Sequence, residues 1–410
     1  MQKTIFIICD GLPDRPIAAL GNKTPLEAAH TPNLDKLAVD GISGMMNLIG
    51  PGVRPGSDTA HLALFGYDPY VYYSGRGPFE CLGIDMDIQP GDVCFRANVG
   101  TLDNGRLVDR RAGRIESTLP VVELLNGLEI DGVKFILKPG LSHRIGLIAR
   151  GQGLSYKISD QDPHVVDVEG VNTVVALDDS PEAKFTAEVM NKFSQIAIDK
   201  LSQAQFNYER KAQGLVLANV VLFRGAGIFP TGLPTFTEKY HLKTAFVAGA
   251  PFYRGIAKFV GMDIISFSPD EGVTGLPDSN LENKLNKAIA VSQDYDLVFV
   301  HIKGADTLAE DGNYQGKVEF IEKIDRAIKP LAESQDFLVV LTADHTTSSK
   351  LKIHTADPVP LTIRGEGVRT DDLNNYSERE CAKGRLGTIQ GINLMPILVD
   401  LMGLAKLFGA

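Results

Sequence analysis

Four short apolar runs, each ending in a turn, constrain the fold of this chain more than any other feature. Residues 4–9 (TIFIIC) are rich in β-branched side chains and end at Asp10-Gly11. The runs at 244–248, 296–303 and 337–342 have the same layout and also end in glycine or acidic turns. Continuous apolar runs of this length are typical of strands buried on both faces of a parallel sheet.

Segments between these runs supply the crossovers that a parallel sheet needs. Residues 317–334 carry apolar side chains at helical spacing, including Val318, Ile321, Ile324 and Ile328. The order strand, helix, strand indicates parallel neighbours joined by helical connections. The carboxyl ends of such strands lie along one edge of the sheet, where ligands bind in open α/β folds.

The middle of the chain has a different pattern. Between residues 93 and 224 the strand-like pieces VCFRANVGTL, VKFILKP, HRIGLIAR and GLVLANVVLFR alternate with glycine and asparagine turns, and an amphipathic segment lies at 182–205. Glycine- and proline-rich stretches at 75–78 and 225–234 are plausible hinges. We therefore predict a discontinuous α/β core at 1–74 and 232–410, with a mainly parallel sheet flanked by helices, and a smaller α+β domain inserted at 75–231.

Charge and cysteine usage narrow the class of protein. The 410 residues carry a net charge of -10 with a pI near 5.4, which argues against a nucleic-acid partner. The four cysteines are scattered without a CxxC pair, and no segment approaches the ~20 consecutive apolar residues of a membrane helix. We expect a cytoplasmic protein with a small-molecule substrate and no membrane partner; assembly into a homo-oligomer is left open.

Acidic and imidazole side chains follow three of the apolar runs. A single aspartate after a strand is usually a helix cap or turn residue, but the joint pattern is harder to explain in that way. Carboxylates packed together repel unless cations neutralise them, and a mixed carboxylate and imidazole set suits Mn²⁺ or Zn²⁺. The residues concerned are Asp10, Asp306, Glu310, Asp344, His345 and His354.

Ser57 is a candidate nucleophile. It lies in the loop PGVRPGSDTAH, which leads into a predicted helix. A serine at that position is often a simple N-cap. Beside a metal ion, however, its hydroxyl loses its proton more easily and becomes an attacking group, and the helix N-terminus favours an incoming phosphate.

Eight motifs resemble those of the archaeal-type cofactor-independent phosphoglycerate mutases, within the alkaline phosphatase superfamily. The resemblance runs over nearly the whole chain and implies an alkaline-phosphatase-like core. The motifs are ICDG at 8–11, TPLEAAHTPNLDKLA at 24–38, PGSDTAHLALFGYDP at 55–69, SGRGPFECLGI at 74–84, DRRAGRI at 109–115, HIKGAD at 301–306, TADH at 342–345 and HTADPVPL at 354–361.

The resemblance implies two adjacent divalent metals. Asp10, Ser57, Asp344 and His345 correspond to the ligands of one, and Asp306, position 310 and His354 to those of the other. Where the family has histidine, this chain has Glu310, with Asp311 as an alternative ligand. An added carboxylate favours Mn²⁺ or Mg²⁺ over Zn²⁺, with Co²⁺ also considered and Mn²⁺ preferred.

The resemblance also implies interconversion of 3-phosphoglycerate and 2-phosphoglycerate through a phosphoserine on Ser57, without 2,3-bisphosphoglycerate. Asp109 or Asp162 is the expected general base. Two further cations, Lys239 and Arg254, are expected near the transferring phosphoryl group. Expected substrate-binding residues in the insertion are Arg96, Arg110, Arg114, His143, Arg144, His164 and Arg224. The alternatives are a metal-dependent phosphatase or homoserine-kinase-like phosphotransferase of the same superfamily, or an inactive phosphate-binding relative.

Overall fold

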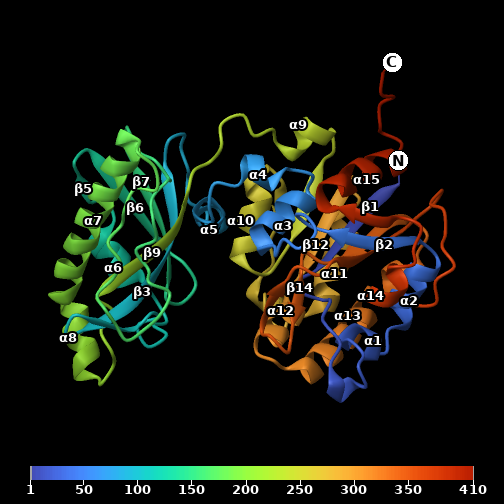
Figure 1. Ribbon diagram of the computed structural model, residues 1–410, viewed down its shortest axis with the longest axis horizontal. Coiled ribbons are helices and arrows are strands. Elements are labelled where there is room, and N and C mark those ends of the chain that lie inside the picture. The colour runs from blue at the N-terminus through green and yellow to red at the C-terminus, as the bar shows by residue number, and fades with distance from the viewer. Residues whose placement is uncertain (1, 410) are drawn as a thin grey trace. The chain divides into compact units, whose positions relative to one another are not determined.

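The computed structural model describes residues 2–409 and divides the chain into two compact units (Figure 1). Unit 1 contains the described residues up to Tyr72 and from Pro234 onward, and unit 2 contains Tyr73–Leu233. The boundaries expected from the sequence, 74/75 and 231/232, lie two residues from these junctions.

An eight-stranded sheet forms the centre of unit 1, in the order β11-β10-β12-β1-β13-β16-β2-β17. Its strands are β1 (Lys3–Cys9), β2 (Ile42–Asn47), β10 (Thr244–Val247), β11 (Asp263–Ile265), β12 (Leu297–Ile302), β13 (Phe337–Thr342), β16 (Val359–Arg364) and β17 (Gly387–Gln390). β1 pairs in parallel with both β12 and β13, so Ile8 lies opposite His301 on one side and Thr342 on the other. Among these eight strands only β16 runs against the rest. The predicted α/β class with a mainly parallel sheet is confirmed.

Helices pack around this sheet, and the longer ones bury an apolar face. In the long helix α13 the side chains of Ile321, Ile324 and Ile328 are fully buried, and their spacing of three and four residues places them on one face. The helices of unit 1 are α1 (Pro25–Ala28), α2 (Pro32–Val39), α3 (Ser57–Leu64), α4 (Pro69–Tyr72), α9 (Phe236–Tyr240), α10 (Pro251–Phe259), α11 (Leu281–Val291), α12 (Gly304–Glu310), α13 (Tyr314–Glu333), α14 (Glu378–Cys381) and α15 (Leu394–Leu401).

Unit 2 is an antiparallel sheet covered by helices. β3 pairs with β4, β7 and β9, and the sheet has seven strands. They are β3 (Val93–Asp103), β4 (Arg106–Asp109), β5 (Glu129–Ile130), β6 (Val133–Pro139), β7 (Arg144–Arg150), β8 (Val168–Glu169) and β9 (Val220–Gly227). The helices are α5 (Gly77–Gly83), α6 (Leu119–Leu125), α7 (Pro181–Ser202) and α8 (Gln205–Ala212). Phe193 of α7 stacks on Phe135 of β6 with ring centroids 4.2 Å apart, which fixes α7 on the sheet.

One predicted strand of unit 2 is shorter than its sequence pattern. The apolar run at 214–224 predicts a strand over its whole length, but β9 begins at Val220. Side chains bind the backbone just before β9 instead: Asn207 contacts the N–H and the carbonyl of Ala218, Thr101 donates to the Leu217 carbonyl and Arg210 donates to the Val216 carbonyl. These bonds satisfy the backbone without a ladder.

Two further features of the described residues are the state of the cysteines and the character of the helices. All four cysteine side chains are buried free thiols. Among residues 2–409, no helix combines the length and the apolar character needed to cross a lipid bilayer.

A buried ion pair ties three segments of unit 1 together. The Nζ of Lys317, on α13, donates to Asp14 Oδ2 (3.1 Å) and to the carbonyls of Pro13 (3.1 Å) and Thr347 (2.9 Å). Glu378 accepts the Asp14 N–H at 3.1 Å. Burial raises the pKa of Glu378 from 4.5 to about 7.

We expect Glu378→Gln to flatten the pH dependence of stability. Because the folded-state pKa is raised, the folded protein keeps the Glu378 proton between pH 4.5 and about 7, where the unfolded chain has lost it. The contribution of Glu378 to the free energy of unfolding is therefore full below pH 4.5 and falls as pH rises through 7. When urea unfolding is measured below and above pH 7, the free energy of unfolding of the wild type should fall with rising pH by on the order of 1–3 kcal/mol more than that of the variant. Equal losses would contradict this assignment.

Candidate metal centre

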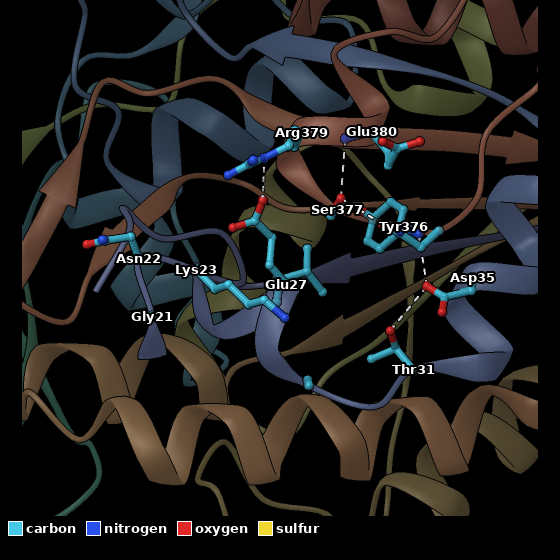
Figure 2. A pocket seen from close by; sticks show the side chains of 13 residues that line it. Gly21, Asn22, Lys23, Glu27, Thr31, Asp35, Tyr376, Ser377, Arg379 and Glu380 are labelled. Atoms are coloured by element: carbon cyan, nitrogen blue, oxygen red, sulfur yellow. Dashed lines mark hydrogen bonds and ion pairs between the residues drawn. The ribbon is translucent and has the colours of Figure 1, made fainter. Parts of the chain in front are cut away.

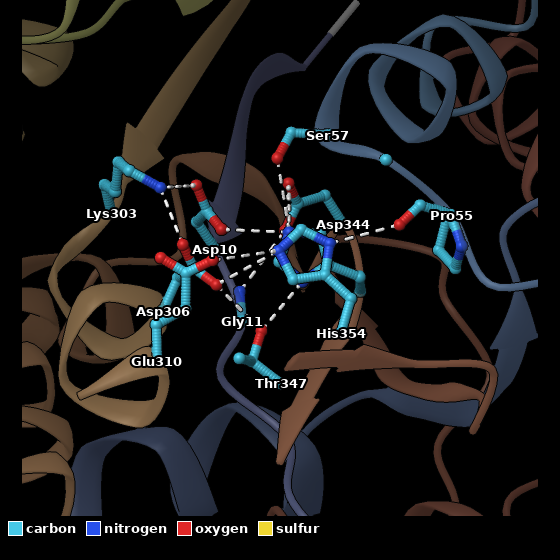
Figure 3. A network of polar contacts seen from close by, with 12 residues as sticks. Asp10, Gly11, Pro55, Ser57, Lys303, Asp306, Glu310, Asp344, Thr347 and His354 are labelled. Carbon is cyan, nitrogen blue, oxygen red and sulfur yellow. Dashed lines mark hydrogen bonds and ion pairs between the residues drawn. The ribbon is translucent and has the colours of Figure 1, made fainter. Parts of the chain in front are cut away.

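Strand ends deliver the acidic side chains to one edge of the unit 1 sheet. Asp10 follows β1, Asp306 lies in the first turn of α12 after β12, and Asp344 and His345 follow β13. β1 lies between β12 and β13, so these groups meet although Asp10 is far from the other three in the chain (Figure 3). All four are almost completely buried.

A hairpin and a helix complete the group. β14 (Thr346–Ser348) and β15 (Ile353–Thr355) pair antiparallel, which returns His354 opposite Thr347 and stacks its ring on His345 at 3.5 Å. Ser57 is the first residue of α3, so it is not the N-cap, which is Gly56. We call the following set the acid–imidazole cluster: Asp10, Ser57, Asp306, Asp344, His345 and His354.

Hydrogen bonding fixes which imidazole nitrogen of His345 faces this cluster. The Thr347 hydroxyl donates to Asp306 Oδ1 at 2.8 Å, so its oxygen accepts from His345 Nδ1 at 3.0 Å. His345 Nε2 therefore presents a lone pair. Although burial and the charge of Asp10 act to raise it, the contacts of His354 and Lys303 bring the pKa of Asp306 to about 2, so this carboxylate is ionised and accepts.

The free nitrogen of His345 meets the Ser57 hydroxyl and two carboxylate oxygens at one point. His345 Nε2 lies 3.2 Å from Asp10 Oδ1, 3.3 Å from Ser57 Oγ and 3.4 Å from Asp344 Oδ2. Both carboxylate oxygens are buried and have no hydrogen-bond partner among the described residues. Four ligands of a tetrahedral ion at ~2.0 Å would lie about 3.3 Å apart, so the donor set fits a divalent cation.

A second donor group adjoins the first. His354 Nδ1 donates to the Pro55 carbonyl at 3.1 Å, which turns Nε2 towards Asp306 Oδ1 (3.4 Å) and Glu310 Oε1 (3.8 Å). Glu310 lies one helical turn after Asp306 in α12, as the sequence spacing predicted, and its side chain is 53% exposed. Asp311 is the C-cap of the same helix.

The protonation states suit cation binding. Burial lowers the pKa of His345, so this imidazole stays neutral. Burial, together with the charges of Asp10 and Asp306, raises the pKa of Asp344 well above its usual range. Ionisation of all three carboxylates, those of Asp10, Asp306 and Asp344, is therefore unfavourable unless positive charge enters the cluster.

Five residues at the site were not predicted from the sequence. His61, Tyr253, His301, Lys303 and Thr347 all contact cluster residues. Two of them had available signals, since His61 lies four residues after Ser57 in a helix and Lys303 immediately follows a strand end. Tyr253 comes from α10, whose apolar pattern gives no hint of this contact.

In unit 2, some of the expected substrate-binding residues form one charged cluster. Arg110 makes a two-pronged pair with Asp162 (2.9 and 2.6 Å), and Arg224 lies 3.7 Å from the same carboxylate and 2.8 Å from His164 Nδ1. Although burial acts to raise it, the hydrogen bonds of Arg110 and of the His164 N–H hold the pKa of Asp162 below its usual value. His164 Nε2 lies 3.1 Å from Asp160.

Other expected residues of unit 2 gather around Glu80. Arg96 lies opposite Arg224 in the β3–β9 ladder and 3.5 Å from Glu80. Burial lowers the pKa of Arg96 to about 9, and Arg144 adds a nearby positive charge. Burial beside Arg144 also lowers the pKa of His143 to about 4, which keeps that imidazole neutral.

Two expected residues of unit 2 lie outside these clusters. Asp109 is a turn residue, because its two carboxylate oxygens accept the N–H groups of Arg111 (2.6 Å) and Gly113 (2.9 Å). Arg114 is exposed and has a left-handed backbone with φ of 59°.

The two expected cations of unit 1 differ in their surroundings. Lys239 donates to the Gly66 carbonyl and lies 4.3 Å above the Tyr67 ring. Arg254 follows Tyr253 in α10, and its buried Nε has no hydrogen-bond partner among the described residues.

A polar hollow of about 460 Å³ opens elsewhere on unit 1, between residues 21–35 and 375–380 (Figure 2). Two of its acidic side chains have partners within the hollow: Glu27 accepts from Arg379 at 2.9 Å, and Asp35 accepts the Tyr376 N–H at 2.9 Å. None of the acid–imidazole cluster lines it.

Comparison with known proteins gives consistent matches over the full chain. The model of the Metalloenzyme superfamily matches residues 2–401. A 2,3-bisphosphoglycerate-independent phosphoglycerate mutase of Methanocaldococcus jannaschii is 45% identical over 100% of this chain and 99% of the relative, and one of Archaeoglobus fulgidus is 46% identical over 99% of each.

Two solved structures resemble the fold closely. One is a protein of Pyrococcus horikoshii, with a TM-score of 0.85 and 37% identity over 100% of this chain and 99% of the other. The second is the cofactor-independent phosphoglycerate mutase of Thermoplasma acidophilum, with a TM-score of 0.72 and 38% identity over 98% and 100% of the two chains.

We expect Asp344→Asn to abolish stabilisation by divalent cations. Wild-type protein with Mn²⁺ at 100 times its Kd should gain about 3 kcal/mol of unfolding free energy, seen as a raised unfolding temperature that a chelator reverses. The variant should gain little, because it lacks the carboxylate of Asp344, which supplies one of the two oxygen atoms without a hydrogen-bond partner.

Asp325→Asn provides the control for this comparison. Asp325 is a buried carboxylate that accepts the N–H groups of Asn33 and Leu34, away from the cluster. Its loss should lower the unfolding temperature but preserve the gain on adding Mn²⁺. An equal gain in Asp344→Asn and wild type would exclude Asp344 from cation binding.

Proposed function

The chain belongs to the Metalloenzyme superfamily and, within it, to the 2,3-bisphosphoglycerate-independent phosphoglycerate mutases, and on this basis we propose that it interconverts 3-phosphoglycerate and 2-phosphoglycerate. The observation that carries the proposal is a serine hydroxyl 3.3 Å from His345 Nε2, beside two carboxylate oxygens without hydrogen-bond partners. This arrangement supports metal-assisted attack by Ser57 on phosphorus.

Two groups of residues are proposed to hold two divalent cations. Asp10, Ser57, Asp344 and His345 form the first group, and Asp306, Glu310 and His354 form the second. When bound, the cations would lower the pKa of the Ser57 hydroxyl and neutralise charge on the phosphoryl oxygens. Because Glu310 adds a carboxylate oxygen where relatives of the resembled family have imidazole, we propose Mn²⁺ as the preferred ion, ahead of Zn²⁺, Co²⁺ and Mg²⁺.

The chain's own residues then account for the two phosphoryl transfers. Ser57 Oγ loses its proton and attacks the phosphorus of 3-phosphoglycerate. The bond from phosphorus to the glycerate 3-oxygen breaks, that oxygen takes up a proton, and phosphoserine forms. Glycerate stays bound while its 2-hydroxyl loses a proton and attacks the phosphoserine, which restores Ser57. Because the phosphoryl group leaves and returns through the same serine, 2,3-bisphosphoglycerate is not needed as a cofactor.

Arginines of unit 2 are proposed to bind the glycerate portion. Arg110 and Arg224 share Asp162, and Arg96 lies next to Arg224 across the ladder, which supports a preorganised anion site. Of the two candidate bases we favour Asp162, because it lies among these cations whereas both oxygens of Asp109 bind backbone N–H groups. Lys239 and Arg254 are proposed to add positive charge near the phosphoryl group.

We expect Ser57→Ala to reduce mutase activity by at least about 10³-fold, because the attacking oxygen is lost. The measurement is enolase-coupled absorbance with 3-phosphoglycerate and Mn²⁺, together with mass spectrometry of acid-quenched protein for phosphoserine at position 57. Ser43→Ala is the matched control, since Ser43 is buried and its hydroxyl contacts Thr362 outside the site. Release of free phosphate without 2-phosphoglycerate would favour a phosphatase instead.

We expect Glu310→His to shift metal preference towards Zn²⁺. Imidazole is a softer ligand than carboxylate, and the substitution removes one negative charge from the second group of ligands. The ratio of Mn²⁺-supported to Zn²⁺-supported kcat/KM should fall by about tenfold in the variant. Asp311→His is the control: an unchanged ratio in Glu310→His together with a changed ratio in Asp311→His would assign the ligand to Asp311.

A further inference from the structure

The carboxylate of Asp10 uses its two oxygens in different ways. Oδ2 accepts from three side chains: Tyr253 Oη of α10 at 2.5 Å and, at the end of β12, His301 Nε2 at 3.1 Å and Lys303 Nζ at 3.4 Å. Oδ1 has no hydrogen-bond partner among the described residues and lies 3.2 Å from His345 Nε2. One oxygen is thus held by the protein, and the other is left for a cation.

We propose that Tyr253 is a positioning residue of the phosphoryl-transfer site, which orients Asp10 for the cation and adjoins the nucleophile Ser57. Its hydroxyl makes the shortest of the three contacts to Asp10 and lies 3.5 Å from Ser57 Oγ. This inference rests on the function proposed above and assigns a role in it to a residue of α10.

Packing holds the Tyr253 hydroxyl in this place. The side chain is 3% exposed, and its ring stacks on the His301 imidazole with centroids 3.6 Å apart and an interplanar angle of 23°. Two residues that both donate to Asp10 Oδ2 therefore also fix one another. A ring clamped in this way has few alternative rotamers, so the hydroxyl is preorganised.

Tyr253 has one hydroxyl proton, so it can donate to Asp10 or to Ser57 but not to both at once. Asp10 Oδ2 is an acceptor, and the 2.5 Å distance assigns the Tyr253 proton to that bond. The Tyr253 oxygen then presents its lone pairs to Ser57 Oγ. Ser57 can accordingly point its own proton at Tyr253 or at His345 Nε2, and in either case its oxygen stays within the cluster.

Orientation of Asp10 matters because the terminal torsion of an aspartate is broad and roughly two-fold. Without a donor on Oδ2, rotation would exchange the two oxygens and blur the cation-facing position. Groups that orient metal ligands in this manner typically affect metal affinity or activity by about 10–100-fold when they are removed.

Tyr253→Phe tests the proposal, since it removes one oxygen and keeps the ring stacked on His301. The first readout is Mn²⁺ affinity of the protein without substrate, measured by electron paramagnetic resonance of free Mn²⁺, and we expect Kd to rise about tenfold or more. The second is steady-state kinetics, where kcat should fall by a similar factor while KM for 3-phosphoglycerate stays within about twofold.

Tyr376→Phe is the matched control. Tyr376 is also a buried tyrosine, and its hydroxyl contacts the carbonyls of Leu341 and Pro360, neither of which belongs to the cluster. Its loss should leave Mn²⁺ affinity and kcat unchanged. A double-mutant cycle with Asp10→Asn adds specificity: if Tyr253 acts through Asp10, Tyr253→Phe should weaken Mn²⁺ binding little further in that background.

Two outcomes overturn the inference. Wild-type Mn²⁺ affinity and kcat in Tyr253→Phe would exclude a positioning role, and fully additive losses in the double mutant would exclude action through Asp10. Failure of the proposed function is a separate result: wild-type protein would then bind Mn²⁺ without mutase activity, and the affinity measurement on Tyr253→Phe would still decide the role of this residue.

Discussion

Repulsion among three buried carboxylates is the constraint on which the site depends. Asp10, Asp306 and Asp344 lie together at the carboxyl edge of a parallel sheet, where burial removes the water that would otherwise screen them. Lys303 contacts two of them and offsets part of this charge. The remaining imbalance gives the site its capacity for divalent cations, and the surrounding hydrogen bonds determine which oxygen atoms are left to bind them.

Hydrogen bonds from the surrounding fold orient the oxygen atoms of these three carboxylates. Each carboxylate shares its oxygens between protein donors and the cluster, as Thr347 shows by donating to Asp306 while accepting from His345. The β14–β15 hairpin and the N-terminus of α3 add His354 and Ser57 from other segments. Strand ends therefore supply the charge, and the loops and helices around them supply its orientation.

The sequence predicted the groups that follow regular periodicity and missed those that depend on packing. Apolar runs located β1, β12 and β13 and hence the acidic strand ends, because buried parallel strands have a clear pattern. The contact of Tyr253 with Asp10 was not predictable, since an aromatic residue on an amphipathic helix reads as core. The extent of β9 was overestimated because side-chain bonds, such as those of Asn207 to the backbone of Ala218, replace the ladder there.

The central place of β1 has a consequence for how the chain acquires its structure. Its two sheet neighbours, β12 and β13, come from the last third of the sequence, after the whole of unit 2 has been made. Unit 2 is continuous in sequence and has its own apolar core, so it can fold early during synthesis. The first strand must wait for its partners, which makes assembly of unit 1 a late, long-range and comparatively slow event.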